Sequence, residues 1–236
     1  MTTKNNLLLI AGGCLVFAAL SGTSSAVTID YRHEMKDTAK RDHKDRLLIS
    51  HRFANGFGLS SEVKWKSGDN KSDSPYDDTI SDGSEVVASY LHNFDQTWFA
   101  ETGFSLESGS DSNNYRPYVT GGLNWNEDVS TTLRYRPYYK RIADGKGEDD
   151  RGHQLNLVVN WKFHKDFMFS SDFEWKRSEN TTQWDDEKTG WLYEGKLAYS
   201  LDKNWKPYVA IANVGGDDKY DDQRQTRYRV GIQYNF

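Results

Sequence analysis

The stretch TRYRVGIQYNF, from Thr226 to Phe236, decides the fold of this chain. Apolar and polar residues alternate along it without a break. One parity carries Tyr228, Val230, Ile232, Tyr234 and Phe236, and the other carries Arg227, Arg229, Gly231 and Gln233. Because successive side chains of a strand point to opposite faces, this pattern predicts a β-strand with one apolar and one polar face.

The first 26 residues have the features of a signal peptide. Lys4 supplies a positive start, residues 7–20 form an apolar run, and residues 24–26 give a small-residue cleavage site. The run of about 14 residues is too short for a membrane helix. A lipid anchor at Cys14 is the weaker alternative, because Ala11 stands where such a site needs a large aliphatic residue. We therefore expect export and cleavage after residue 26.

Residues 27–236, which remain after cleavage, are expected to form one domain in the bacterial outer membrane. Cys14 is the only cysteine of the chain, so no disulfide is available. Lys4 is the only charged residue that is removed, so the formal net charge changes from −5 to −6. Aromatic residues make up 14% of a chain whose mean hydropathy is −0.85. A polar but aromatic exported chain fits a membrane barrel, in which only every second residue must be apolar.

The period of two predicts twelve strands and no convincing amphipathic helix. Segments of about ten residues suit barrel strands that cross a bilayer. The last strand ends at Phe236, as expected of a barrel that the outer-membrane assembly machinery recognises. The predicted strands are Val27–Met35, Arg46–Ala54, Phe57–Lys66, Glu85–Phe94, Trp98–Glu107, Tyr115–Trp125, a seventh containing Thr131–Arg141, His153–Phe163, Phe167–Lys176, Trp191–Leu201, Lys206–Val214 and Thr226–Phe236.

Short and long connections alternate between these strands, as expected when tight turns face the periplasm and longer loops face the exterior. The short connections lie near residues 55–56, 93–96, 126–128, 164–166 and 202–204. The long ones lie near residues 35–45, 67–83, 108–114, 142–151, 177–190 and 215–225.

The stretch TTLRYRPYYKR, from Thr131 to Arg141, predicts what each face of a strand contacts. Leu133, Tyr135 and Tyr139 share one parity, and Arg134, Arg136 and Lys140 share the other. We expect the first set to face lipid and the outer interface, and the second set to face the pore.

Three prolines conflict with this interpretation. Proline lacks the N–H that a sheet ladder needs, and a closed barrel has no free edge to accommodate it. We therefore expect the prolines to mark bulges or strand ends. Pro117 and Pro137 are expected near the outer rim, and Pro207 near the periplasmic rim.

Basic residues gather on the inward parity and are the candidate substrate pathway. Inward acids accompany them, so part of the basic set must form ion pairs, and the sequence leaves open which bases contact a ligand. The inward acids are Asp30, Glu34, Glu62, Glu101, Glu107, Asp172, Glu174 and Glu194. The predicted pore-lining bases are Arg32, Arg52, Lys64, Lys66, Arg116, Arg134, Arg136, Lys140, Lys162, Lys176, Lys196, Arg227 and Arg229.

Two clusters of these bases are expected on opposite walls. The turn after the sixth strand places Arg116 nearly opposite Arg136, and like charges that face each other destabilise a sheet. An inward acid or an anionic ligand must compensate them. In a ring of twelve, the first strand lies across from the seventh, so Arg32, Arg52, Arg227 and Arg229 would form a second basic track. Guanidinium groups bind carboxylates in bidentate fashion, so a carboxylated chain could pass between the tracks.

The long loops hold about half of the acids, outside the predicted wall. The simple interpretation is a set of solvated loops, and the alternative is divalent bridging to lipopolysaccharide phosphates. These acids are Asp69, Asp73, Asp77, Asp78, Asp82, Asp144, Glu148, Asp149, Asp150, Glu179, Asp185, Asp186, Glu187, Asp217, Asp218, Asp221 and Asp222.

Four motifs together resemble the oligogalacturonate-specific porin family of the KdgM type, with the sialic-acid channel as a more distant relative. They are VTIDYRHEMKD at 27–37, DHKDRLLISHRF at 42–53, YRPY at 115–118 and 135–138, and YRVGIQYNF at 228–236. The resemblance spans nearly the whole exported chain. It implies a monomeric twelve-stranded barrel that passes acidic oligosaccharides from pectin breakdown through a pore lined by arginine and lysine.

Three rival functions have less support in the sequence. An outer-membrane hydrolase needs a convergent nucleophile and base, but His33, His51, His92 and His153 fall on the outward parity. A structural or adhesive barrel would have a lumen filled by balanced ion pairs. Basic residues interleaved with aromatic ones can mimic a nucleic-acid surface, but export argues against that partner. The sequence shows no metal-ligand spacing and no phosphate-binding glycine loop, so no cofactor is expected.

Overall fold

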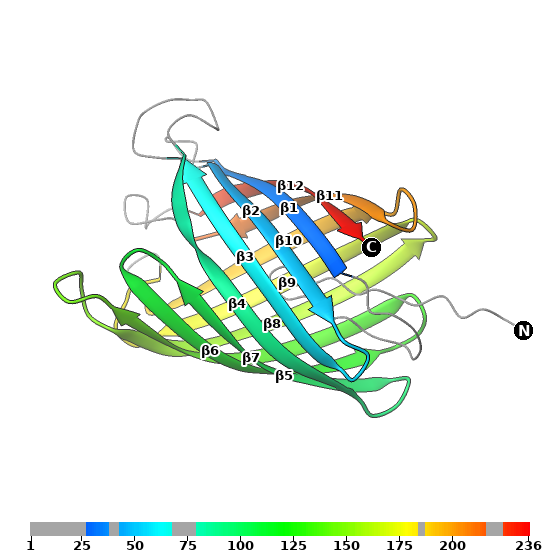
Figure 1. Ribbon diagram of the computed structural model, residues 1–236, viewed down its shortest axis with the longest axis horizontal. Coiled ribbons are helices and arrows are strands. Elements are labelled where there is room, and N and C mark those ends of the chain that lie inside the picture. Colours follow the sequence, from blue (N-terminus) through cyan, green and yellow to red (C-terminus); the bar gives the residue numbers. More distant parts are fainter. Residues whose placement is uncertain (1–26, 38–42, 68–78, 184–186, 216–223) are drawn as a thin grey trace, which may run out of the picture.

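A computed structural model describes residues 27–37, 43–67, 79–183, 187–215 and 224–236. Twelve antiparallel strands form a closed ring, so the predicted all-β barrel is confirmed. Each strand pairs with its neighbours in sequence, and β1 (Val27–Lys36) closes the ring against β12 (Gln225–Asn235). Figure 1 shows the strands tilted across the wall, with the C-terminus beside the start of β1. The described part of the chain holds no helix long and apolar enough to cross a membrane.

The bounds of most strands lie within a few residues of the prediction. The main exception is β4, which begins at Thr79, six residues earlier than Glu85. The ten remaining strands are β2 (His43–Arg52), β3 (Phe57–Ser67), β4 (Thr79–Asn93), β5 (Trp98–Ser108), β6 (Ser112–Asn124), β7 (Val129–Ile142), β8 (Asp150–His164), β9 (Phe167–Ser178), β10 (Thr189–Tyr199) and β11 (Trp205–Val214).

The two parities of each strand lie on opposite faces of the wall, as predicted. In β7, Leu133 is 52% exposed, whereas its neighbour Arg134 is 5% exposed. In β12, Val230 is 54% exposed and Gln233 is 1% exposed. The apolar parity therefore faces outward and the polar parity faces inward, which is the reverse of a water-soluble fold and is typical of a membrane barrel.

The tight turns share one closing device. The Oδ1 atoms of Asp95, Asn126 and Asp202 each accept hydrogen bonds from the backbone amides two and three residues later, at 2.7–2.8 Å. Asparagine and aspartate favour such turns because the side chain mimics a backbone carbonyl. These turns lie at the end of the barrel where Phe236 donates its backbone N–H to Val27 at 3.0 Å. Residues 1–26, predicted as a signal peptide, and parts of the long loops (residues 38–42, 68–78, 184–186 and 216–223) lie outside the described residues.

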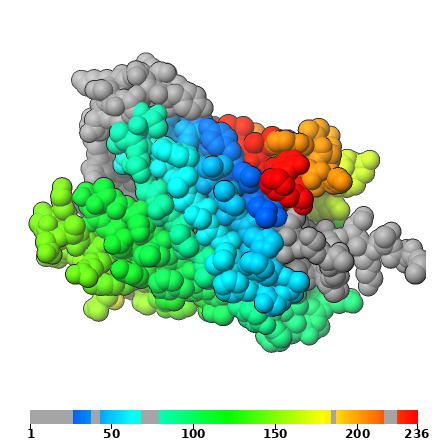
Figure 2. Space-filling view, in the orientation of Figure 1, coloured from blue at the N-terminus to red at the C-terminus, as the bar shows by residue number. Residues whose placement is uncertain are grey.

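Aromatic side chains crowd the outward face near the tight turns. Trp98, Trp125 and Trp161 are each more than half exposed there. Trp205 packs against Tyr234 with ring centroids 4.6 Å apart. Figure 2 shows the surface of one side of the barrel, where the neighbouring strands β1 to β4 run from blue to green. Amphipathic aromatic rings favour the boundary between lipid and water, so this girdle fits the periplasmic interface.

Two of the three prolines lie away from their predicted positions. The register of β6 and β7 pairs Tyr115 with Tyr139 and Val119 with Tyr135, so Pro117 faces Pro137 across the same ladder position. The register does not shift there, and the pair lies five residues inside its strands, so neither a bulge nor a rim position is found. Because both missing N–H groups fall at one position, the ladder is interrupted once and resumes on either side. Pro207 is the third residue of β11, near the periplasmic end, as predicted.

Candidate functional site

The inward faces of the strands form a polar lumen, and all thirteen predicted bases lie on that parity. Their surroundings divide them into three groups. Seven pair with carboxylates: Arg32, Arg52, Lys64, Lys66, Arg116, Arg227 and Arg229. Lys196 lies with its ammonium 5.5 Å from the ring centre of Tyr208. Arg134, Arg136, Lys140, Lys162 and Lys176 form no ion pair with any residue that the structure describes, and we call these five the basic strip.

Two glutamates neutralise the arginines where β12 closes on β1. Arg229 reaches Glu34 at 2.7 Å and Glu194 at 2.6 Å. Arg227 reaches Glu194 at 2.8 Å, and Arg32 lies 3.8 Å from Glu34. Three guanidinium groups thus share two carboxylates, which leaves one positive charge on this wall. These ion pairs lie within the wall, so little of the arginines' positive charge is available to a passing anion.

Arg46 is a lumen base that the sequence analysis missed. It lies inside β2 on the same parity as Arg52, which was the signal available for finding it. Its guanidinium pairs with Asp30 at 2.8 Å and with Glu62 at 3.4 Å. Arg52 pairs with Glu101 at 3.0 Å. Both arginines are therefore compensated, in keeping with the neighbouring β12 wall.

Arg116 and Arg136 are diagonal neighbours, not opposite residues. The register of β6 and β7 places Tyr118 across from Arg136, two residues from the predicted position. Arg116 pairs with Glu85 at 2.7 Å and Glu107 at 2.9 Å. The compensation expected for this pair thus comes from two acids on the Arg116 side alone.

Asp82 is one predicted loop acid that instead belongs to the wall. It lies in β4, because that strand starts earlier than expected. It holds Lys66 at 3.1 Å and Lys44 at 3.2 Å. Lys64 pairs with Glu107. The wall formed by β3 and β4 is therefore rich in ion pairs as well.

Asp150 is a second acid that was predicted in a loop but lies in a strand. It is the first residue of β8 and is buried. Its carboxylate accepts hydrogen bonds from Ser178 Oγ at 2.6 Å and from the Tyr138 hydroxyl at 2.9 Å. The strand begins earlier than predicted because these partners bind the carboxylate at the inner edge of the wall.

The two arginines of the basic strip bind neutral amides. Arg134 Nη2 donates to Asn156 Oδ1 at 2.9 Å, and Arg136 Nη2 donates to Gln154 Oε1 at 2.8 Å. Nε and Nη1 of Arg134 have no hydrogen-bond partner among the described residues. A buried guanidinium normally has its donors satisfied, so Arg134 keeps two donors that the described residues do not use.

A layer of amides separates these arginines from the acids of β9. Asn156 Nδ2 donates to Glu174 Oε2 at 3.0 Å and to Asp172 Oδ1 at 3.3 Å. Gln154 Nε2 donates to the same Glu174 oxygen at 2.5 Å. The amides orient the guanidinium groups without neutralising them, because an amide oxygen carries no net charge.

Three inward tyrosines lie over glycines of the adjacent strand. A Cβ on Gly103, Gly152 or Gly231 would lie 2.4, 2.8 or 2.3 Å from the ring or hydroxyl of its tyrosine. The glycines therefore provide the space in which each ring lies flat against the wall. The pairs are Gly103 with Tyr118, Gly152 with Tyr138, and Gly231 with Tyr208.

Each of these tyrosines links an acid to a cation. The hydroxyl groups of Tyr118, Tyr138 and Tyr208 donate to Glu101, Asp150 and Asp30 at 2.7, 2.9 and 3.0 Å. Arg134, Lys176 and Lys196 lie 5.9, 5.0 and 5.5 Å from the respective ring centres. A ring face attracts a cation without removing its charge, so these rings support the bases as the amides do.

The lumen is asymmetric. In the ring order, β7 lies six strands from β1 in either direction. The basic strip occupies β7, β8 and β9, and the neutralised arginines occupy β12, β1 and β2. Bases thus line both walls as predicted, but ion pairs compensate most of one wall. Lys206 of β11 is a further inward base that the sequence analysis did not name. Among the described residues, no group of three or more His, Cys, Asp or Glu is placed to hold a metal ion.

The fold and the lumen agree with comparisons to known proteins. The sequence model of KdgM, the oligogalacturonate-specific porin protein, matches residues 20–236. The chain belongs to the oligogalacturonate-specific porin family. Its members are porins, and this membership together with the barrel places the chain in the outer membrane.

Individual relatives show the extent of the similarity. The oligogalacturonate-specific porin KdgM of Dickeya dadantii (strain 3937) is 50% identical over 240 residues, which cover 99% of this chain and 100% of the relative. A solved KdgM porin in complex with disordered oligogalacturonate is 45% identical, with a TM-score of 0.67, covering 89% of this chain and 99% of that one. The NanC porin has a TM-score of 0.75 at 19% identity, covering 88% and 100%, and shows the fold alone.

Proposed function

We propose that this chain is an outer-membrane channel for acidic oligosaccharides, and that its substrates are oligogalacturonates. The basic strip carries the proposal, because its five cations face the lumen without an ion pair to any described residue. Every unit of an oligogalacturonate bears a carboxylate, so the strip offers successive partners along the chain. The amides and tyrosine rings hold the cations in place while leaving their charge available to the substrate.

The relatives support this substrate class. The family name and the relative from Dickeya dadantii both specify oligogalacturonate, and one solved relative was studied with that ligand. The alternative substrate is another anionic sugar such as sialic acid. Conduction requires sites that bind an ion without retaining it, and donors spread over three strands suit a repeating anion better than a single charge.

The rival functions have less support. A structural or adhesive barrel would have its lumen charges balanced, as they nearly are where β12 meets β1, but the basic strip is not balanced. An enzyme requires a nucleophile beside a base. His33, His51, His92 and His153 all lie on the outward parity, away from the lumen. We therefore propose a channel without catalytic activity.

Further properties belong to the same proposal. The signal peptide would be cleaved after residue 26, and the remaining chain would function as a monomer. The assembly machinery of the outer membrane would recognise the last strand, which ends at Phe236. The acids that remain in the loops would bridge lipopolysaccharide phosphates through divalent cations. Those within residues 69–78, 185–186 and 217–222 lie outside the described residues.

The test is single-channel conductance in a planar bilayer, with trigalacturonate or a neutral trisaccharide added. We expect trigalacturonate to block the parent channel at much lower concentration than the neutral sugar. Arg134→Ala/Arg136→Ala should raise the blocking concentration at least tenfold, because two charge-assisted contacts of about 1.5–3 kcal/mol each are lost. Equal block by both sugars, or an unchanged double variant, would contradict the proposal.

The matched control removes two exposed cations outside the lumen. Lys165 and Lys203 lie in tight turns at the periplasmic end, and the Lys165 side chain is 80% exposed. Lys165→Ala/Lys203→Ala lowers the net charge as much as the lumen variant does. We expect its blocking concentration to match that of the parent, which would separate a local site from a general effect of charge.

A further inference from the structure

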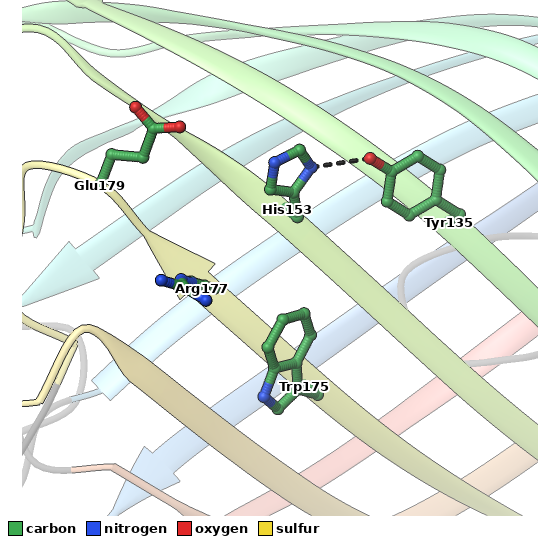
Figure 3. A pocket seen from close by; sticks show the side chains of 5 residues that line it. All are labelled: Tyr135, His153, Trp175, Arg177 and Glu179. Carbon is green, nitrogen blue, oxygen red and sulfur yellow. Dashed lines mark hydrogen bonds between the residues drawn. The ribbon is translucent and has the colours of Figure 1, made fainter.

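An open pocket of about 530 Å³ lies on the outward face of the barrel, away from the lumen. Tyr135 of β7, His153 of β8, Trp175 and Arg177 of β9, and Glu179 just after β9 line it. Figure 3 shows the five side chains gathered across three adjacent strands. The register explains this gathering, because it pairs His153 with Arg177 and pairs Leu155, two residues further along β8, with both Tyr135 and Trp175.

The pocket lies at the exterior end of the wall. Arg177 is one residue from the end of β9, and His153 is three residues from the start of β8. Both positions are at the end opposite the tight turns. At this height the wall changes from apolar side chains to loops, so a molecule in the pocket would contact the headgroup region of the outer leaflet.

The charge of the pocket is positive. Arg177 forms no ion pair with any described residue and is exposed. Glu179 is neutralised by Arg151, whose Nε lies 2.5 Å from Glu179 Oε2. His153 Nδ1 shares a hydrogen bond of 2.7 Å with the Tyr135 hydroxyl, which fixes the ring at the pocket edge. A guanidinium beside an oriented imidazole is a favourable arrangement for a phosphate group.

A second outward arginine provides a contrast. Arg224 lies over the ring of Trp191 at 3.7 Å, and it donates to Asn213 Oδ1 at 2.6 Å and to the Trp191 carbonyl at 2.8 Å. Its donors are therefore used within the protein. Arg177 also lies near a tryptophan, Trp175, but the structure gives its guanidinium no comparable partner among the described residues.

We propose that this pocket binds the phosphorylated headgroup of an outer-leaflet glycolipid. The phosphate contacts Arg177 and His153, and the rings of Trp175 and Tyr135 pack against the sugar and the upper acyl chain. Lipid is the occupant because the outward face of a barrel lies in the bilayer, where a soluble protein or nucleic acid has no access. The site does not depend on which molecule passes through the lumen.

The experiment is native mass spectrometry of the full barrel released from detergent micelles. The probes are a diphosphorylated glucosamine-disaccharide lipid and its fully dephosphorylated form. We expect one copy of the phosphorylated lipid to be retained, and the dephosphorylated lipid to bind at least tenfold more weakly. Arg177→Gln should lower retention of the phosphorylated lipid at least tenfold. Arg177→Lys should lower it less, because lysine keeps the positive charge but cannot form the bidentate hydrogen bonds of a guanidinium group.

Lys165→Gln is the matched control, since it removes an exposed cation at the other end of β8 and should leave retention unchanged. Circular dichroism identifies any variant that fails to fold, and Arg177→Lys then provides the comparison. Equal retention of both lipids, or unchanged retention by Arg177→Gln, would overturn the proposal. Displacement of the lipid by millimolar inorganic phosphate would also overturn it, since the site would then take a free anion.

Discussion

Arg136 and Glu174 form no ion pair, because the side-chain amide of Gln154 lies between them. Gln154 accepts from Arg136 Nη2 at 2.8 Å and donates to Glu174 at 2.5 Å. Asn156 separates Arg134 from the same glutamate in the same way. On the opposite wall, Arg229 contacts Glu34 directly. The difference between a neutralised wall and a basic one thus depends on two amides on the inward face of β8.

Gln154→Glu should therefore weaken substrate binding without removing a base. The new carboxylate would lose the hydrogen bond to Glu174 and pair with Arg136, so that one guanidinium is no longer available to the carboxylates of trigalacturonate. We expect the blocking concentration of trigalacturonate to rise about tenfold, which corresponds to about 1.4 kcal/mol. Single-channel conductance in a planar bilayer measures it.

Asn160→Asp is the matched control for Gln154→Glu. It adds the same charge on the same strand and keeps the oxygen that accepts the Ser170 hydroxyl at 2.7 Å. If both variants change the block equally, the effect comes from the overall potential of the lumen, and the role assigned to Gln154 is wrong.

Gly231→Ala should destabilise the barrel through Tyr208. The added Cβ would lie 2.3 Å from the Tyr208 ring, so the ring must move and its hydroxyl must leave Asp30. Overpacking of this kind costs about 1–3 kcal/mol. Urea unfolding of the barrel in lipid vesicles, followed by tryptophan fluorescence, measures the free energy of unfolding.

Gly121 provides the comparison for this variant, because a Cβ there would have no atom within 4 Å. Gly121→Ala makes the same chemical change in a strand and should alter stability by less than about 0.5 kcal/mol. A loss of stability as large as that of Gly231→Ala would mean that strand glycines matter here for some reason other than contact with a tyrosine.

Glu34→Gln should make the channel more selective for anions. It removes one of the two carboxylates that three arginines share, while an oxygen remains for Arg229 Nε. The lumen gains a positive charge on its neutralised wall, so the reversal potential in a salt gradient should shift toward that of the anion. Breaking a buried pair costs about 3–5 kcal/mol, and a lower stability in urea should accompany the shift.

Glu179→Gln is the control for this charge change, because Glu179 lies on the outward surface and pairs with Arg151. Its reversal potential should equal that of the parent. If Glu34→Gln also leaves the reversal potential unchanged, the arginines at the closure of β12 on β1 do not contribute to the conducting path.

The sequence predicts the faces of this barrel better than it predicts the partners within them. The alternation in residues 131–141 and 226–236 places each side chain inward or outward, because the period of a strand is fixed by its backbone. Pairing depends instead on register, and a shift of two residues keeps the parity while changing every neighbour. For this reason Arg134 and Arg136 lie on the inward face, as the alternation predicts, whereas Arg116 lies two residues away from the position across from Arg136.

Two features depended on information that a single strand does not contain. Pro117 and Pro137 could be understood only when the register showed that they face each other, since each alone breaks the strand rule. The amides of Asn156 and Gln154 are ordinary polar residues in the sequence. Their role appears only when β7 and β9 are placed on either side of β8.

The tight turn at Asp202 should respond to pH in a defined direction. Its carboxylate accepts the backbone N–H groups of Trp205 and Asn204, and these hydrogen bonds lower the pKa of Asp202 below its ordinary 3.8. A group whose pKa is lower in the folded state stabilises the fold fully above its unfolded pKa, and this contribution is lost as the pH falls through the folded pKa. The amide proton signals of Asn204 and Trp205, followed by NMR in micelles, should therefore titrate with a midpoint below 3.8. Asp202→Asn keeps the accepting oxygen but cannot titrate, so its signals should stay constant over the same range. A midpoint above 3.8, or the same titration in the variant, would show that another group controls this turn.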